Sequence, residues 1–322
     1  MFRKGREIIS GKVVIVLVSL LLLGGVAFVA YTFNPNGVVG NAISQVEPGR
    51  SSPSPILQLN GTVVASQING NGTNTPGSSR TSGSSAADQT MPIGDIPGWH
   101  QIFAENFKTN VPVGSFPGTI YGNKFTVYSD GTPDTAGQQG APSRYYPSKV
   151  VSVKNGVLNL YLHTENGTPM AAAILPDLPG NHMYGRYTIR FRSDALPRYK
   201  TAWLLWPDND IWPRNGEIDF PEGDLNRTIA AFMHHQGATV ESDQDVFSST
   251  AAYTSWHTAT IVWTAHEVDF ILDGQAIGTS TTRIPSAPMH WVIQTESCLD
   301  GCPAATTAGN LQIAWMVAYA PA

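Results

Sequence analysis

Charged residues are scarce in this chain of 322 residues. Asp, Glu, Lys and Arg make up 13% of it, against about a quarter in a typical soluble protein. The formal net charge is −5, and no stripe of Lys or Arg runs along any segment. Proteins that bind nucleic acid use such stripes to meet phosphates. The composition therefore argues against a nucleic-acid partner, and with its many aromatic residues it favours a neutral polymer.

Cysteine is nearly absent too, with Cys298 and Cys302 as the only two. Two thiols make a poor zinc site, and in an exported protein we expect a loop-closing disulfide, with free thiols as the alternative. The adjacent His234 and His235 would point to opposite faces of a strand, which disfavours a shared metal ion. No Gly-x-Ser-x-Gly elbow or phosphate loop is present. Metal, esterase and nucleotide chemistry therefore lack support.

One long hydrophobic run stands near the N-terminus, at residues 13–33. It is long enough to cross a bilayer as a helix. The tail before it, residues 1–12, has four basic residues against one acidic residue and should stay cytoplasmic. We therefore predict a transmembrane signal anchor that leaves the C-terminal domain outside the cell. A cleaved signal peptide and a secreted protein are the alternative.

The rest of the chain changes character twice. Residues 34–93 are rich in Ser, Gly, Asn, Thr and Pro, a composition that cannot bury enough apolar surface to fold and predicts a disordered linker. Residues 94–322 form a segment of the size common for a single β-sandwich domain. We expect this domain to be monomeric.

Helical periodicity is missing after the hydrophobic run, and short strand signals recur instead. Two hairpins are predicted around Asn155-Gly156 and Asp273-Gly274, which are favoured two-residue turns. The other strand-like segments are 187–192, 201–206, 217–220, 229–234, 258–263, 291–295 and 311–319. Many short strands with Gly and Pro turns indicate an all-β fold, a jelly-roll sandwich of two antiparallel sheets.

Three carboxylates lie within six residues in the stretch Glu217-Ile-Asp-Phe-Pro-Glu222. In a regular strand Glu217 and Asp219 share one face, while Glu222 points away. A β-bulge at Phe220-Pro221 would return Glu222 to that face, and Pro is tolerated at bulges. The alternative is an acidic strand edge that faces solvent.

A pair of carboxyls on one face suits a glycosidase. Retaining glycosidases place a nucleophile and an acid about 5 to 5.5 Å apart. We assign Glu217 as the nucleophile, Glu222 as the acid/base and Asp219 as the carboxyl that tunes Glu217. Mutual repulsion is expected to keep Glu222 protonated as the acid.

Tryptophans gather just before the acidic stretch, at Trp203, Trp206 and Trp212. Aromatic faces suit the apolar C–H faces of sugar rings. Trp203, inside an apolar strand, fits core packing equally well, whereas Trp206 and Trp212 each adjoin a Pro in a predicted loop. Arg190 is a further candidate for binding sugar hydroxyls, with an exposed strand arginine as the alternative.

The stretch Trp212-Pro-Arg-Asn-Gly-Glu217-Ile-Asp-Phe-Pro-Glu222 resembles the Glu-x-Asp-x-x-Glu signature of glycoside hydrolase family 16, in the bulged form of its laminarinase-like members. The similarity extends over most of residues 98–322. Its other parts are Ile102-Phe-Ala-Glu-Asn-Phe107, Gly185-Arg-Tyr-Thr-Ile-Arg190, Ala202-Trp-Leu-Leu, Val262-Trp-Thr and Asp269-Phe-Ile-Leu-Asp-Gly274. The resemblance implies a concanavalin A-like jelly roll whose concave cleft binds a β-glucan or related polysaccharide, and the same three carboxylate roles.

The resemblance also bears on three other positions. His234 matches a cleft histidine of laminarinase-like members. Gln294 stands where the family usually has Asn, and we expect it to contact substrate. Ala314 stands where many members carry an aspartate that helps to hold a structural calcium, which argues against calcium here. We expect no other cofactor.

The polymer is not specified by these residues. A β-1,3-glucan is the first expectation, mixed-linkage β-1,3-1,4-glucan the second, and galactans remain open. Transglycosylation, or carbohydrate binding without catalysis, is an alternative to hydrolysis. The segments 130–144 and 165–181 are predicted to be loops that shape the subsites.

Overall fold

The computed structural model describes residues 15–22, 25–34, 37–44, 90–180 and 183–322, with the backbone alone for the first three segments. The chain divides into two units, Met1–Ser79 and Arg80–Ala322. Each unit is described here by itself.

The first unit contains a three-stranded antiparallel sheet of β1 (Ile15–Leu22), β2 (Gly25–Asn34) and β3 (Gly37–Ser44). Strands thus stand where the sequence predicts a helix over 13–33. Among the described residues, no helix is long and apolar enough to cross a membrane. The predicted tail 1–12 and most of the predicted linker lie outside the described residues, and membrane anchoring stays a prediction.

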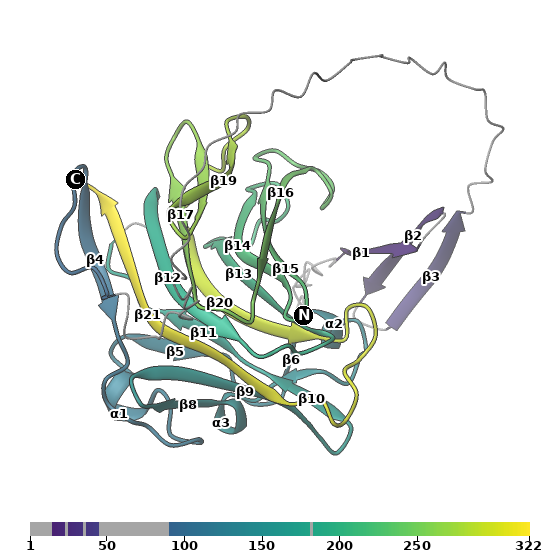
Figure 1. The fold of residues 1–322 in the computed structure, drawn as a ribbon. Coiled ribbons are helices and arrows are strands. Elements are labelled where there is room, and N and C mark those ends of the chain that lie inside the picture. The colour runs from purple at the N-terminus through teal and green to yellow at the C-terminus, as the bar shows by residue number, and fades with distance from the viewer. Residues whose placement is uncertain (1–14, 23–24, 35–36, 45–89, 181–182) are drawn as a thin grey trace, which may run out of the picture. The chain divides into compact units, whose positions relative to one another are not determined.

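The second unit is built from two sheets (Figure 1). The eleven-stranded sheet runs in the order β19 (Gln275–Ser280), β18 (Val268–Leu272), β17 (His257–Trp263), β12 (Gly185–Ser193), β21 (Gly309–Pro321), β9 (Val157–Glu165), β10 (Thr168–Ala171), β7 (Arg144–Tyr145) and β6 (Thr132–Pro133), with β4 (Trp99–Glu105) on β21 and β8 (Val151–Lys154) on β9. The seven-stranded sheet runs in the order β16 (Gln244–Ala252), β15 (Thr228–His234), β14 (Glu217–Asp224), β13 (Tyr199–Pro207), β20 (Met289–Ser297), β11 (Ala173–Pro176) and β5 (Phe125–Val127). This arrangement fits the predicted all-β jelly roll.

Two details of the prediction need correction. The sheets are not purely antiparallel, because β10 and β7 pair in parallel. The described residues also include three single-turn helices, α1 (Gly118–Tyr121), α2 (Thr135–Gln138) and α3 (Pro147–Val150). Four residues are too few to show helical periodicity in a sequence.

The two predicted hairpins are confirmed. β8 and β9 are joined by Asn155 and Gly156, with φ of 56° and 74°, and β18 and β19 by Asp273 and Gly274, with φ of 50° and 81°. Positive φ at both central residues defines the turn whose twist matches that of the strands, and Asn, Asp and Gly tolerate it best.

The hydrophobic core lies between the two sheets and is filled by alternate residues of their strands. On β13, Trp203 and Leu205 are fully buried in this core. Ala202, Leu204 and Trp206 belong instead to a separate small cluster on the opposite side of the sheet. That side of the seven-stranded sheet, defined by these three residues, is called the Trp206 face below.

The segment 165–181 is not the loop that the sequence predicts. Residues 168–171 and 173–176 of it form β10 and β11, which belong to different sheets, with Ala172 at the crossing. The backbone of Ala172 is hydrogen-bonded to the Thr295 hydroxyl at 3.0 Å and 2.9 Å. This segment therefore ties the sheets together rather than standing free at the surface.

We predict that Trp203→Ala lowers the free energy of unfolding by about 3–5 kcal/mol, because it leaves a large cavity in the core. Denaturant unfolding of the variant and the wild type measures the difference. A loss below about 1 kcal/mol would contradict the core position of this tryptophan.

Candidate active site

The acidic strand β14 is irregular where the sequence predicts a bulge. Asp219 pairs with Phe232 on β15, and Glu222 pairs with Ala230. Three steps along β14 thus oppose two steps along β15, so one residue is extra. The register against β13 shifts over the same residues. The predicted bulge at Phe220-Pro221 is confirmed.

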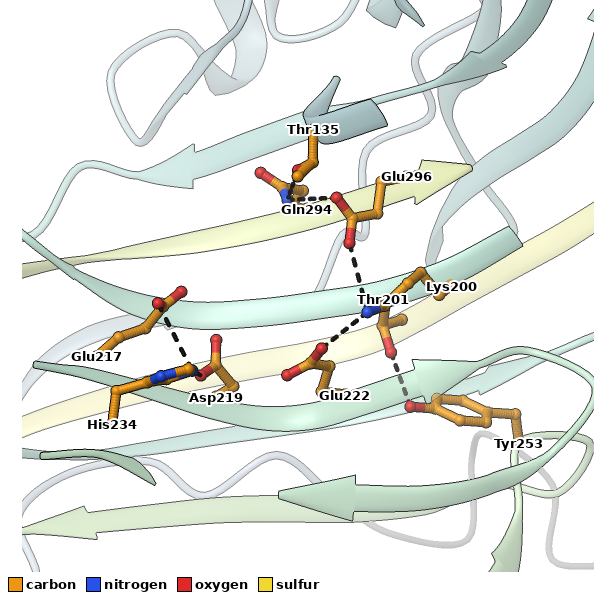
Figure 2. Close-up of polar contacts among 10 residues, drawn as sticks. All are labelled: Thr135, Lys200, Thr201, Glu217, Asp219, Glu222, His234, Tyr253, Gln294 and Glu296. Atoms are coloured by element: carbon orange, nitrogen blue, oxygen red, sulfur yellow. Dashed lines mark hydrogen bonds and ion pairs between the residues drawn. The ribbon is translucent and has the colours of Figure 1, made fainter. Parts of the chain in front are cut away.

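The bulge places all three carboxyls on the Trp206 face (Figure 2). Asp219 is paired with Leu204 on β13, and Glu222 is paired with Ala202. Residues directly opposite each other on neighbouring strands share a face, and both partners belong to the Trp206 face. Without the extra residue, Glu222 would point into the core.

Gly216 lets the chain enter this strand. Its φ is +73°, and an added Cβ would lie 2.6 Å from the backbone oxygen of His234 and 2.7 Å from the ring of Pro285. Both the positive φ and the close approach require glycine. The residue before Glu217 therefore fixes where that carboxyl enters the sheet.

Burial dominates the electrostatics of the first two carboxyls. Glu217 and Asp219 are 7% and 2% exposed. Burial raises the pKa of Glu217 to about 8. Burial, followed by the charges of Glu217 and Glu222, raises the pKa of Asp219 well above its usual value. Two buried carboxyls that share a hydrogen bond, as Glu217 and Asp219 do, favour holding a single proton between them.

His234 lies opposite Glu217 on β15. Its Nδ1 lies 2.9 Å from the backbone oxygen of Glu241. A carbonyl only accepts, so Nδ1 carries the proton and Nε2 is free to accept. Nε2 lies 3.5 Å from Asp219 Oδ2 and 3.8 Å from Glu217 Oε2. Burial lowers the pKa of His234, which keeps it neutral beside the two acids.

Glu217, Asp219 and His234 also offer ligand atoms that all lie within 4.8 Å of one another. One imidazole and two carboxylates suit a divalent metal ion. An ion held there would bind the carboxylate oxygen that a nucleophile needs. The calcium position of the family does not fit, because Ala314 packs in a hydrophobic cluster and has no oxygen in its side chain.

Glu222 has a cationic partner that the sequence reading missed. Lys200 Nζ lies 2.8 Å from Glu222 Oε1 and 3.6 Å from Glu296 Oε1. Glu296 is 3% exposed, and Gln294 Nε2 donates to it at 3.1 Å. The two-residue period of strands could have indicated both residues. Glu296 lies two positions after Gln294, and Lys200 lies two positions before Ala202, so each shares a sheet face with that residue.

Two of the three predicted tryptophans lie together beside the carboxyls. The rings of Trp206 and Trp212 stack with centroids 5.8 Å apart and planes at 22°. Trp212 meets the His234 ring edge-on at 5.9 Å, and Trp206 Nε1 donates to Asp210 Oδ1 at 2.8 Å. An aromatic platform therefore adjoins the Glu217 end of the site.

Trp203 and Arg190 do not reach this site. Trp203 is fully buried in the core, where its ring meets Phe191 edge-on at 5.1 Å. Arg190 lies on β12, in the other sheet, with its guanidinium 5.6 Å from the Trp256 ring. Trp203 points into the core because it alternates with Ala202 and Leu204 of the Trp206 face. Arg190 points away from the core because it alternates with the core residues Ile189 and Phe191.

The predicted loop 130–144 and the disulfide loop lie at the end of β20. The Asp134 carboxyl, at the start of α2, accepts from the Ser297 amide at 3.0 Å. The predicted disulfide between Cys298 and Cys302 is present directly after this strand. Both loops are therefore anchored next to Glu296.

Comparison with known proteins identifies the family. The model of "Glycosyl hydrolases family 16" matches residues 138–317, more than half of the chain. The chain belongs to this family. It is a glycoside hydrolase, as its acidic signature predicts. No curated protein matches the chain.

Solved structures show the same fold. An endo-beta-1,3(4)-glucanase called SCLam is 17% identical, with a TM-score of 0.58 over 72% of this chain and 94% of that chain. The laminarinase catalytic domain from Thermotoga petrophila is 17% identical, with a TM-score of 0.56 over 71% and 99%. A LamA variant from Z. galactanivorans, bound to laminaritriose and laminaritetraose, is 18% identical, with a TM-score of 0.52 over 68% and 98%.

The raised pKa of Glu217 predicts a pH-dependent stability. Burial raises this pKa from its ordinary value of 4.5 to about 8, so the folded state holds more protons than the unfolded state between these two pH values. Stability must fall as pH rises through that window. We expect Glu217→Gln to melt at least about 2 °C above the wild type at pH 8, with the difference vanishing near pH 4.

The control for this measurement is Glu267→Gln, which removes one carboxylate from an exposed position. It should melt like the wild type at both pH values. A melting difference between Glu217→Gln and wild type that is the same at pH 4 and pH 8 would show that the charge of Glu217 carries no cost.

Proposed function

We propose that this hydrolase cleaves a β-glucan internally and retains the configuration at the anomeric carbon. The observation that carries the proposal is the bulge in β14, which brings Glu217, Asp219 and Glu222 onto one sheet face. A retaining mechanism needs two carboxyls beside the scissile bond, here Glu217 and Glu222. The third carboxyl, Asp219, is the group that helps to keep Glu217 ionised.

In this mechanism Glu217 attacks the anomeric carbon while Glu222 protonates the departing oxygen. Water then attacks the glycosyl-enzyme, and Glu222 takes its proton. Glu217 must be ionised to attack, although it is buried. Asp219 lowers the pKa of Glu217 through a shared hydrogen bond, and the pKa of Asp219 is itself raised by burial and by the charges of Glu217 and Glu222. When the shared proton resides on Asp219, Glu217 is the anion that attacks.

A neutral glucan fits the surroundings of the carboxyls. The stacked Trp206 and Trp212 offer an apolar surface for a pyranose ring. Gln294 and His234 add uncharged polar groups nearby. The similar solved structures are named as β-1,3-glucanases and β-1,3(4)-glucanases. We therefore place β-1,3-glucan first and mixed-linkage glucan second.

We predict that Glu217→Gln reduces hydrolysis of laminarin and lichenan by at least about 10⁴-fold, because an amide cannot form the glycosyl-enzyme. Reducing-end release by the purified variant measures the loss, and Glu267→Gln should hydrolyse like the wild type. Undiminished release by Glu217→Gln would overturn the assignment.

Product analysis of the wild type separates the alternatives in the same assay. Oligosaccharides shorter than the substrate support hydrolysis. Products longer than the starting oligosaccharide would show transglycosylation, in which a sugar replaces water as acceptor. Binding to both glucans without any release would indicate a carbohydrate-binding jelly roll.

A further inference from the structure

Lys200 lies between two carboxylates that come from different strands. β13, which carries Lys200, runs between β14 with Glu222 and β20 with Glu296. Lys200 pairs directly with Glu296 in the strand register. Its Nζ is 2.8 Å from one carboxylate and 3.6 Å from the other (Figure 2). The ammonium of Lys200 therefore contacts the carboxyl groups of both Glu222 and Glu296.

This contact is not a surface ion pair. The side chains of Lys200, Glu222 and Glu296 are 22%, 16% and 3% exposed. Ion pairs that are largely shielded from water interact more strongly than exposed ones. The charges of Glu222 and Glu296 raise the pKa of Lys200 against its burial, which keeps it an ammonium.

The groups that act on Glu222 come from every neighbouring element. They are Glu217 and Asp219 on β14, Lys200 on β13, His234 on β15, Glu296 on β20, Glu241 after β15 and Tyr253 after β16. Within this set of described residues Lys200 is the only lysine or arginine. Among these groups the fixed positive charge in contact with Glu222 therefore comes from Lys200.

We propose that Lys200 is a positioning residue that shares its charge between Glu222 and Glu296 and so sets when Glu222 holds a proton. This inference rests on the proposed function, in which Glu222 changes protonation state twice per turnover. Glu296 is the second anchor, which keeps the ammonium compensated while Glu222 is neutral.

The charges balance through the cycle. In the first step the Glu222 proton goes to the glycosidic oxygen, the C1–O bond breaks and the Glu217–C1 bond forms. Lys200 then stabilises the new Glu222 carboxylate. In the second step a water proton returns to Glu222, the water oxygen bonds C1, and the C1–Glu217 bond breaks. Lys200 is then compensated by Glu296 alone.

Two substitutions should move the pH profile in opposite directions. The alkaline limb of kcat/KM reports the essential acid of the free enzyme. Lys200→Met removes the cation beside Glu222, so we expect this limb to move up by about 1–3 pH units. Glu296→Gln removes the competing anion, so the limb should move down. Lys200→Arg keeps the charge and should stay near the wild-type profile.

The measurement is kcat/KM on laminarin between pH 4 and pH 10, with Lys154→Met as a control that removes an exposed lysine. Melting curves establish that each variant is folded. If Lys200→Met does not fold, Lys200→Gln keeps a polar head group and makes the same comparison with Glu296→Gln.

An alkaline limb that stays in place without the Lys200 charge, or that moves the same way in both variants, overturns the inference. These outcomes require a wild type that hydrolyses the glucan. A wild type without glucan hydrolysis at any pH would instead refute the proposed function itself.

Discussion

The site depends on the free-energy cost of holding like charges close together on a buried sheet face. Glu217 and Asp219 are almost fully removed from water, and Glu222 joins them through the bulge in β14. A regular strand would relieve this repulsion by directing the third carboxyl elsewhere. The fold instead keeps the three carboxyls together, and neighbouring groups then adjust the charge of each one.

Different neighbouring groups act on the charge of each carboxyl. Burial raises the pKa values of both Glu217 and Asp219. Burial also lowers the pKa of His234 and keeps it neutral, although its Nδ1 is bonded to a backbone oxygen. Glu222 has a cation instead, which is shared with Glu296. Neighbouring carboxyls in different environments can take different protonation states.

The two-residue period of strands accounts for what could be predicted from the sequence. It placed Glu217 and Asp219 on one face, and the proline at the bulge allowed Glu222 to be added. The same period, applied to β13, would have put Trp203 in the core, since Ala202 and Trp206 lie on the other face. An apolar strand does not reveal which of its two faces is the core.

Contacts between distant strands could not be predicted in this way. The pair formed by Lys200 and Glu296 depends on β13 and β20 being neighbours, although they are some ninety residues apart in the chain. The position of Arg190 depends on β12 belonging to the other sheet. Strand order is decided by packing of the whole sandwich, and a single sequence carries little local signal for it.

The most direct test of the central claim is to trap the glycosyl-enzyme. A β-glucoside or β-laminaribioside with fluorine at C2 and a good leaving group should accumulate as a covalent adduct, because fluorine slows the second step more than the first. Peptide mass spectrometry should find the sugar on Glu217. A sugar on another residue, or turnover of glucan with no adduct on any residue, would contradict the account.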